Sequence, residues 1–84
     1  MNEISDPLFE SILQPLDQQQ RLDVIAVAGA YRQTRVADGK STDCLRAAVT
    51  AYRHRNPDDV DEAVNHSVGR ILSIADEWIN SSCQ

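Results

Sequence analysis

The sequence predicts an all-α protein, a compact bundle of about four helices near residues 6–14, 18–37, 42–55 and 57–80. Two observations lead to this prediction. Apolar residues recur at spacings of three and four, the period of a helix with one buried face. Residues that favour helix starts, such as aspartate, asparagine, serine and proline, precede several of these stretches. A chain of 84 residues is long enough for one domain, so we expect residues 1–84 to form a single helical unit.

The first helix is predicted between two prolines. Asp6 is a good N-cap, and Pro7 suits the first helical position. Pro15 lacks an N–H group and clashes with the preceding turn, so the helix should stop near residue 14. Asp17, followed three residues later by Gln20, is an acidic form of the capping box and predicts the start of the next helix.

The second segment fits two kinds of structure. Its apolar residues cover more than one face, so residues 24–27 could form a short core strand or part of a buried helix. Good helix formers on both sides of residues 22–31 favour the helix. Gly39 then stands where a left-handed residue would end that helix.

Two further helices follow in the sequence. Ser41 or Thr42 is expected to cap the third helix, which should run to Arg55. Asn56 and Pro57, followed by two aspartates, predict the start of a fourth helix. From there one broad apolar stripe continues to Ile79, which predicts a single long helix.

Composition limits the classes of function. Charged residues make up 25% of the chain and hydrophobic residues 42%, which is ordinary for a globular protein. The longest apolar run, residues 24–31, is too short to span a bilayer, and the N-terminus does not resemble a signal peptide. We therefore expect a soluble cytoplasmic protein with no membrane partner. Because small domains have thin stability margins, self-association into a homodimer is also an expectation.

The residue types used in catalysis do not form a known pattern here. The three glycines are scattered singly, so the chain has no phosphate-binding loop. Cys44, His54, His66 and Cys83 lack the short paired spacings of structural zinc sites. Nothing near Cys44 would activate it as a nucleophile. We expect no enzymatic activity, no cofactor and no metal.

Charge is distributed unevenly along the chain. Residues 1–31 carry a net charge of −4, residues 32–55 carry +4 and residues 56–84 carry −5. Much of this pattern suits helix ends, where bases belong at the C-terminus and acids at the N-terminus. Asp76 and Glu77 are the exceptions, because the predicted long helix would end just beyond them. They flank Trp78, which is either a core residue or an interface anchor.

The leading hypothesis is a non-enzymatic regulator or inhibitor that binds another protein. Its acidic helical surfaces would occupy a basic, nucleic-acid-facing site on the partner, because charge complementarity speeds encounter and fixes orientation. Phage anti-defence proteins such as anti-CRISPR proteins, and bacterial immunity proteins, are similar in size and charge, an analogy of class alone. The expected contact residues are Asp58, Asp59, Asp61, Glu62, Asp76, Glu77 and Trp78.

The alternative hypothesis uses the basic segment 32–55 to bind DNA, a nucleotide or another anion. Around Gly39 the segment resembles a helix-turn-helix, with Ser41 starting the second helix. The repeated Tyr-Arg pairs at 31–32 and 52–53 would stack on bases and contact phosphates if they converge, also across subunits of an oligomeric nucleotide sponge or sensor. The candidate anion contacts are Arg32, Arg35, Arg46, Arg53 and Arg55.

Overall fold

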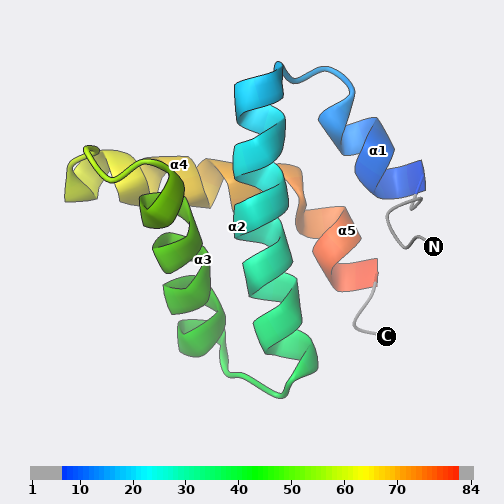
Figure 1. Ribbon diagram of the computed structural model, residues 1–84. Coiled ribbons are helices and arrows are strands. Elements are labelled where there is room, and N and C mark those ends of the chain that lie inside the picture. Colours follow the sequence, from blue (N-terminus) through cyan, green and yellow to red (C-terminus); the bar gives the residue numbers. More distant parts are fainter. Residues whose placement is uncertain (1–6, 82–84) are drawn as a thin grey trace.

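A computed structural model describes residues 7–81 and shows five helices. They are α1 (Pro7–Leu13), α2 (Gln18–Val36), α3 (Ser41–Arg55), α4 (Asp61–Ile74) and α5 (Asp76–Ser81). The described residues contain no strand, which confirms the predicted all-α bundle and settles residues 22–31 as helix. In Figure 1, α2 lies in the centre with α3 antiparallel beside it, α4 crosses behind both, and α1 and α5 lie on the other side of α2.

The connection between α1 and α2 is stabilised by side chains. The capping box is confirmed, since Asp17 Oδ1 accepts from the Gln20 N–H at 2.8 Å and Gln20 Oε1 accepts from the Asp17 N–H at 3.3 Å. The Arg21 guanidinium donates to the carbonyl oxygens of Leu13 and Leu16, both at 3.0 Å. Leu13 is the last residue of α1, where carbonyl groups lack helical donors, and Leu16 lies in the connection that follows. Arg21 therefore supplies donors to carbonyl groups at and just beyond the end of α1. The predicted N-cap of α1, Asp6, lies outside the described residues.

The end of α2 corrects the role expected for Gly39. The left-handed residue is Asp38, with φ 69°, and Gly39 has no positive φ. The Asp38 N–H donates to the Arg35 carbonyl at 3.0 Å and the Gly39 N–H donates to the Thr34 carbonyl at 2.9 Å, the two bonds of a Schellman motif. Aspartate tolerates the left-handed conformation better than most residues, which explains why the motif forms with Asp38 and not glycine at the left-handed position.

The start of α3 lies one residue earlier than predicted. Lys40 occupies the N-cap position and α3 begins at Ser41, so neither Ser41 nor Thr42 is the cap. The Asp43 carboxylate accepts from the Lys40 backbone N–H at 3.3 Å. An acid in the first turn therefore satisfies one of the free N–H groups in place of a hydroxyl cap.

The predicted fourth helix, 57–80, is wrong at its start. Residues 56–59 form a turn in which the Asp59 N–H donates to the Asn56 carbonyl at 3.3 Å, and α4 begins only at Asp61. Asparagine followed by proline favours the first two positions of a β-turn as much as it favours a helix start. Asn56 and Pro57 therefore belong to a turn and not to the start of a helix.

The predicted long helix is also broken near its end. Ala75 separates α4 from α5, so Asp76 and Glu77 lie in the first turn of a separate helix. The expectation that these acids stand at a helix C-terminus is thus wrong. Acids in a first turn are favoured by the helix dipole, so their positions need no external partner to explain them.

Trp78 belongs to the hydrophobic core. Its side chain is 7% exposed and stacks on Phe9 of α1, with ring centroids 4.0 Å apart and an angle of 22°. The Arg32 guanidinium lies over the indole, 4.3 Å from the ring centroid, in cation–π geometry. Trp78 therefore joins α1, α2 and α5, and it is not available as an exposed anchor.

Candidate interaction surfaces

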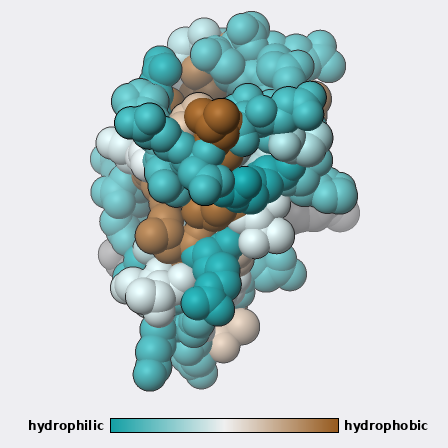
Figure 2. All heavy atoms as spheres, turned by 90° about the vertical axis from the view of Figure 1, so that its left-hand side faces the viewer, coloured by the Kyte–Doolittle hydropathy of each residue, from teal (hydrophilic) through white to brown (hydrophobic). Residues whose placement is uncertain are grey.

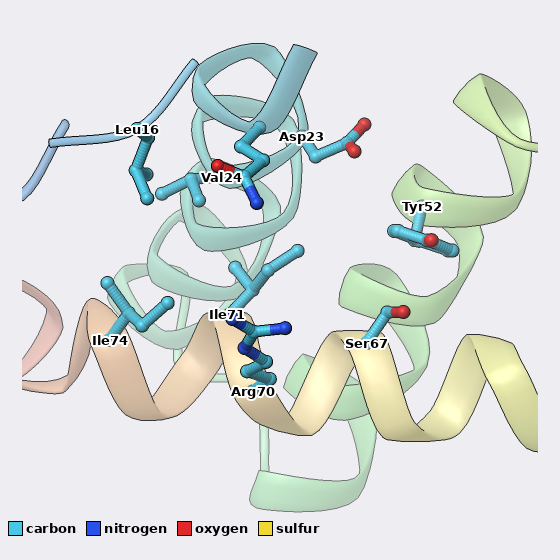
Figure 3. Close-up of a pocket in the computed structure, with 9 residues that line it drawn as sticks. Leu16, Asp23, Val24, Tyr52, Ser67, Arg70, Ile71 and Ile74 are labelled. Atoms are coloured by element: carbon cyan, nitrogen blue, oxygen red, sulfur yellow. The ribbon is translucent and has the colours of Figure 1, made fainter. Parts of the chain in front are cut away.

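An open groove of about 190 Å³ lies where α2, α3 and α4 meet. Figure 3 shows that its two ends differ in character: Leu16 and Ile74 lie at one end, and Asp23, Tyr52 and Ser67 lie at the other. Val24 and Ile71 form apolar surface between them. The groove is smaller than the pockets that hold drug-sized ligands, which have volumes of about 300–1,000 Å³.

Tyr52 connects the groove with the turn before α4. Its hydroxyl donates to the Asp59 carboxylate at 2.9 Å, although the ring itself is buried. The pKa of Tyr52 is raised above its ordinary value of 10.0. A hydrogen bond with Ser67 acts to lower this pKa, but burial, the bond to Asp59 and the negative charges of Asp59 and Asp23 together outweigh it. The hydroxyl therefore stays protonated and serves as a donor.

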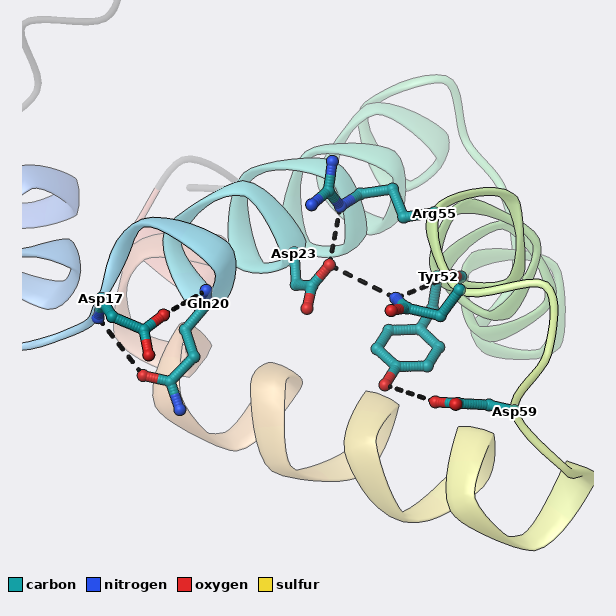
Figure 4. Close-up of polar contacts among 7 residues, drawn as sticks. Asp17, Gln20, Asp23, Tyr52, Arg55 and Asp59 are labelled. Atoms are coloured by element: carbon teal, nitrogen blue, oxygen red, sulfur yellow. Dashed lines mark hydrogen bonds and ion pairs between the residues drawn. The ribbon is translucent and has the colours of Figure 1, made fainter.

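Asp23 joins α2 to the end of α3. Its Oδ1 accepts from Arg55 Nε at 2.6 Å and from Asn56 Nδ2 at 3.4 Å (Figure 4). The side chains of Asp23 and Arg55 are only 13% and 26% exposed, so this pair is partly shielded from water. Asn56 also donates to the Tyr52 carbonyl at 3.3 Å. These contacts hold the helical hairpin of α2 and α3 closed at this end.

The sequence does not predict this polar cluster. One signal was present: Asp23 is the only charged residue between Arg21 and Arg32, in the middle of an apolar stretch. An acid inside such a stretch is often half-buried and paired, because an unpaired buried charge is costly. Its partner could not be read from the sequence, since Arg55 lies 32 positions away.

The predicted acidic contact residues fall into two separate places. Asp58 and Asp59 lie in the turn between α3 and α4, next to Asp61 and Glu62 in the first turn of α4, whereas Asp76 and Glu77 lie on α5. Figure 1 places the beginning of α4 and the helix α5 on opposite sides of α2. The structure therefore does not combine all six acids into one surface.

The acids at the turn differ in how they are held. Asp59 is half-buried and accepts from Tyr52, and Asp61 forms an ion pair with Arg53. Asp58 and Glu62 are exposed, and neither makes an ion pair or a side-chain hydrogen bond with any residue in 7–81. On α5, Asp76 accepts from the Asn80 amide at 3.1 Å, and Glu77 is exposed.

An exposed valine lies among the acids at the turn. Val60 is 68% exposed and stands directly between Asp59 and Asp61 in the chain. Figure 2 views the side of the molecule on which α3 and the beginning of α4 lie, and there hydrophobic surface is enclosed by hydrophilic surface. We call Asp58, Val60, Asp61 and Glu62 the acidic corner.

The arginines of the basic segment are mostly engaged within the molecule. Arg32 lies over Trp78, Arg35 donates to Asn80 at 3.3 Å, and Arg53 and Arg55 form ion pairs. Arg46 is exposed, and no ion pair of Arg46 occurs among the described residues. The five candidate anion contacts therefore do not converge on one open site.

The geometry expected for a helix-turn-helix is also not observed. Helices α2 and α3 lie antiparallel, whereas the helices of a helix-turn-helix cross at about 90–120°. Asp23, which contacts the end of α3, is eight residues from Tyr31, about 12 Å along α2. The two Tyr-Arg pairs thus lie toward opposite ends of the helical hairpin.

The candidate metal ligands are not assembled within the described part of the chain. Cys44 is buried, and its thiol lies 3.9 Å from the Gly39 carbonyl oxygen, while His54 and His66 are exposed. No group of three histidine, cysteine, aspartate or glutamate side chains suited to a metal occurs among residues 7–81. Cys83 lies outside the described residues.

Comparison with known proteins adds no further constraint. No protein-family model, curated protein or solved structure matches the chain. Within residues 7–81, no helix combines the length and the hydrophobicity that a membrane span requires.

Proposed function

We propose that this protein is a non-enzymatic regulator or inhibitor that binds a basic surface of another protein through the acidic corner. The observation that carries the proposal is the contrast between free acids and engaged arginines. Asp58 and Glu62 have no partner among residues 7–81, whereas four of the five arginines in the candidate anion site contact other side chains. Unpaired exposed charges are the ones available to attract a partner of opposite sign.

The composition of the acidic corner also suits a protein partner. Interfaces commonly place apolar residues at the centre and charged residues at the rim. Val60 supplies an exposed apolar side chain, and the adjacent acids supply the rim. A partner with an apolar depression surrounded by lysine or arginine would match both features, with the charges steering the encounter.

The anion-binding alternative has weaker support from the same contacts. To bind a phosphate, Arg53 and Arg55 would have to leave Asp61 and Asp23, and the partly shielded pair of Asp23 and Arg55 would be costly to break. We expect the protein to pass through a heparin column at low salt without retention. Retention that is lost in the Arg53→Ala variant would favour the alternative.

A matched pair of charge reversals tests the proposal. Glu62 and Glu10 are both exposed glutamates in the first turn of a helix, but Glu10 lies on α1, away from the acidic corner. Each change to lysine alters the net charge by the same amount. Wild-type protein, Glu62→Lys and Glu10→Lys are immobilised, and capture of basic proteins from a nuclease-treated lysate is measured at rising salt.

The proposal predicts that Glu62→Lys loses salt-sensitive capture and that Glu10→Lys retains it. Equal loss in both variants would mean that only the net charge matters. Loss of salt-sensitive capture in Glu10→Lys alone would indicate that the binding surface lies on the side of α1. Either result would contradict binding through the acidic corner.

A further inference from the structure

Helix α2 carries a face without any charged residue along its whole length. Its members recur at spacings of one, three or four and lie opposite the buried residues Val24, Val27 and Ala28. Three of them are large and exposed: Leu22 (42%), Ile25 (45%) and Val36 (64%). The charge-free face consists of Gln18, Leu22, Ile25, Ala26, Gly29, Gln33 and Val36.

In Figure 1, none of the other helices of residues 7–81 lies in front of α2. Helix α4 crosses behind α2, so the opposite side of α2 points toward the viewer. In a chain with 25% charged residues, a solvated helix face would normally carry charges. An exposed face that carries large apolar side chains and no charge is instead typical of a surface that packs against another helix.

Gly29 lies at the middle of the charge-free face. A Cβ atom added there would meet nothing within 4 Å, so the packing of the single chain does not require glycine. Glycine inside a helix costs about 0.5–1 kcal/mol relative to alanine. A glycine that the monomer does not need, on an exposed face, allows the backbone of a second helix to approach closely.

We propose that a second copy of this chain packs on the charge-free face, with the two α2 helices antiparallel and the twofold axis near Gly29. Leu22 and Val36 each lie seven residues, or about two turns, from Gly29. In this arrangement, Leu22 of each copy lies against Val36 of the other, and the two Gly29 residues meet. The spacing of Leu22, Ile25 and Gly29 also matches the alternation of three and four in helices that pair along a seam.

The absence of charge favours a second copy over a foreign partner. A twofold interface must be complementary to itself, because the same surface of both copies takes part. A charged side chain near the axis of one copy would therefore lie against the same charge on the other copy. The chain has a net charge of −5, so two copies repel each other over most of their surfaces. The charge-free face is where this repulsion is smallest. A basic partner, in contrast, would gain no electrostatic attraction from it.

Salt separates this proposal from the proposed function. Salt screens the repulsion between two acidic copies, so the dimer should persist or strengthen as salt rises. Binding of a basic partner through the acidic corner should weaken under the same conditions. Failure of one proposal therefore leaves the other intact.

The test measures solution mass by light scattering from micromolar to near-millimolar protein. Gly29→Lys places a long charged side chain at the centre of the proposed contact. Gly69→Lys is the matched control, because Gly69 is also helical and an added Cβ there also meets nothing within 4 Å. Circular dichroism checks that both variants keep their helices, and Ile25→Gln provides a second, uncharged change on the same face.

We expect the wild type and Gly69→Lys to dimerise alike and Gly29→Lys to dimerise at least about tenfold more weakly, or about 1.4 kcal/mol. Ile25→Gln should weaken the dimer in the same direction. A wild-type monomer at all concentrations would overturn the proposal. A dimer that Gly29→Lys and Ile25→Gln leave unchanged, or that Gly69→Lys weakens equally, would overturn the assignment to this face.

Discussion

Replacing Gly39 with alanine should destabilise the protein although the backbone at this residue is not left-handed. An added Cβ would lie 2.5 Å from Thr34 Cγ2 and 2.7 Å from the Thr34 carbonyl oxygen. Both distances are far below van der Waals contact. Rotation of the Thr34 side chain would break its hydroxyl bond to the Ala30 carbonyl, which is 2.9 Å long. Rotation would also leave the clash with the carbonyl oxygen in place.

The size of the effect follows from two opposing terms. Overpacking of this kind costs about 1–3 kcal/mol. Alanine also lowers the conformational entropy of the unfolded chain relative to glycine, which stabilises the folded state by about 0.4–1 kcal/mol. We therefore expect Gly39→Ala to lose about 1–2 kcal/mol net, which corresponds to a fall in Tm of roughly 4–16 °C for a domain of this size.

Thermal unfolding followed by the fluorescence of Trp78, the single tryptophan, measures this effect. Gly69→Ala is the control with the opposite expected sign, because its Cβ meets open space and alanine favours the helix by about 0.5–1 kcal/mol. Combining Gly39→Ala with Thr34→Ser should recover only part of the loss, since the carbonyl oxygen remains. A Gly39→Ala variant as stable as the wild type would show that the contact with Thr34 imposes no steric cost.

Three further predictions concern the polar contacts. Asp17→Ala should lose about 1 kcal/mol in urea unfolding because it removes the capping box, and no loss would contradict that role. Asp23→Ala should lose about 1–3 kcal/mol because it leaves Arg55 unpaired, and the double variant with Arg55→Ala should lose less than the sum of the two single changes; additive losses would refute the coupling. The raised pKa of Tyr52 means that the folded state keeps its proton after the unfolded state has lost it, so this stability is present below pH 10.0 and is lost as pH rises through the folded pKa. Tyr52→Phe should show a flatter decline above pH 10.0, and an unchanged slope would contradict the assignment.

Local signals predicted most of the helices but not the breaks between them. Pro15, Asp17 and Gln20 act through groups within a few residues, so their effects could be read directly. The break at Ala75 has no proline or glycine to mark it. It lies just before Trp78, whose contacts with Phe9 and Arg32 join segments far apart in the sequence. Such tertiary contacts override local helix preference.

The candidate surfaces were predictable only in part. The acids near the start of α4 were found from charge alone, because neighbouring residues in a turn stay together in any fold. Which acids remain free depends on long-range partners: Asp59 contacts Tyr52 and Asp61 contacts Arg53. The sequence does not predict the charge-free face of α2, because apolar residues on more than one face of a helix indicate a buried helix, whereas one side of α2 is exposed.

The most direct test of binding through the acidic corner is an amide NMR titration of the protein with an oligolysine peptide. The peptide supplies a basic surface of known composition, and each amide reports where it binds. We predict that the changes in amide chemical shift concentrate at residues 58–62 and disappear at high salt. Shift changes centred on the acids of α1 or α5, or spread evenly over every exposed acid, would contradict the proposed function.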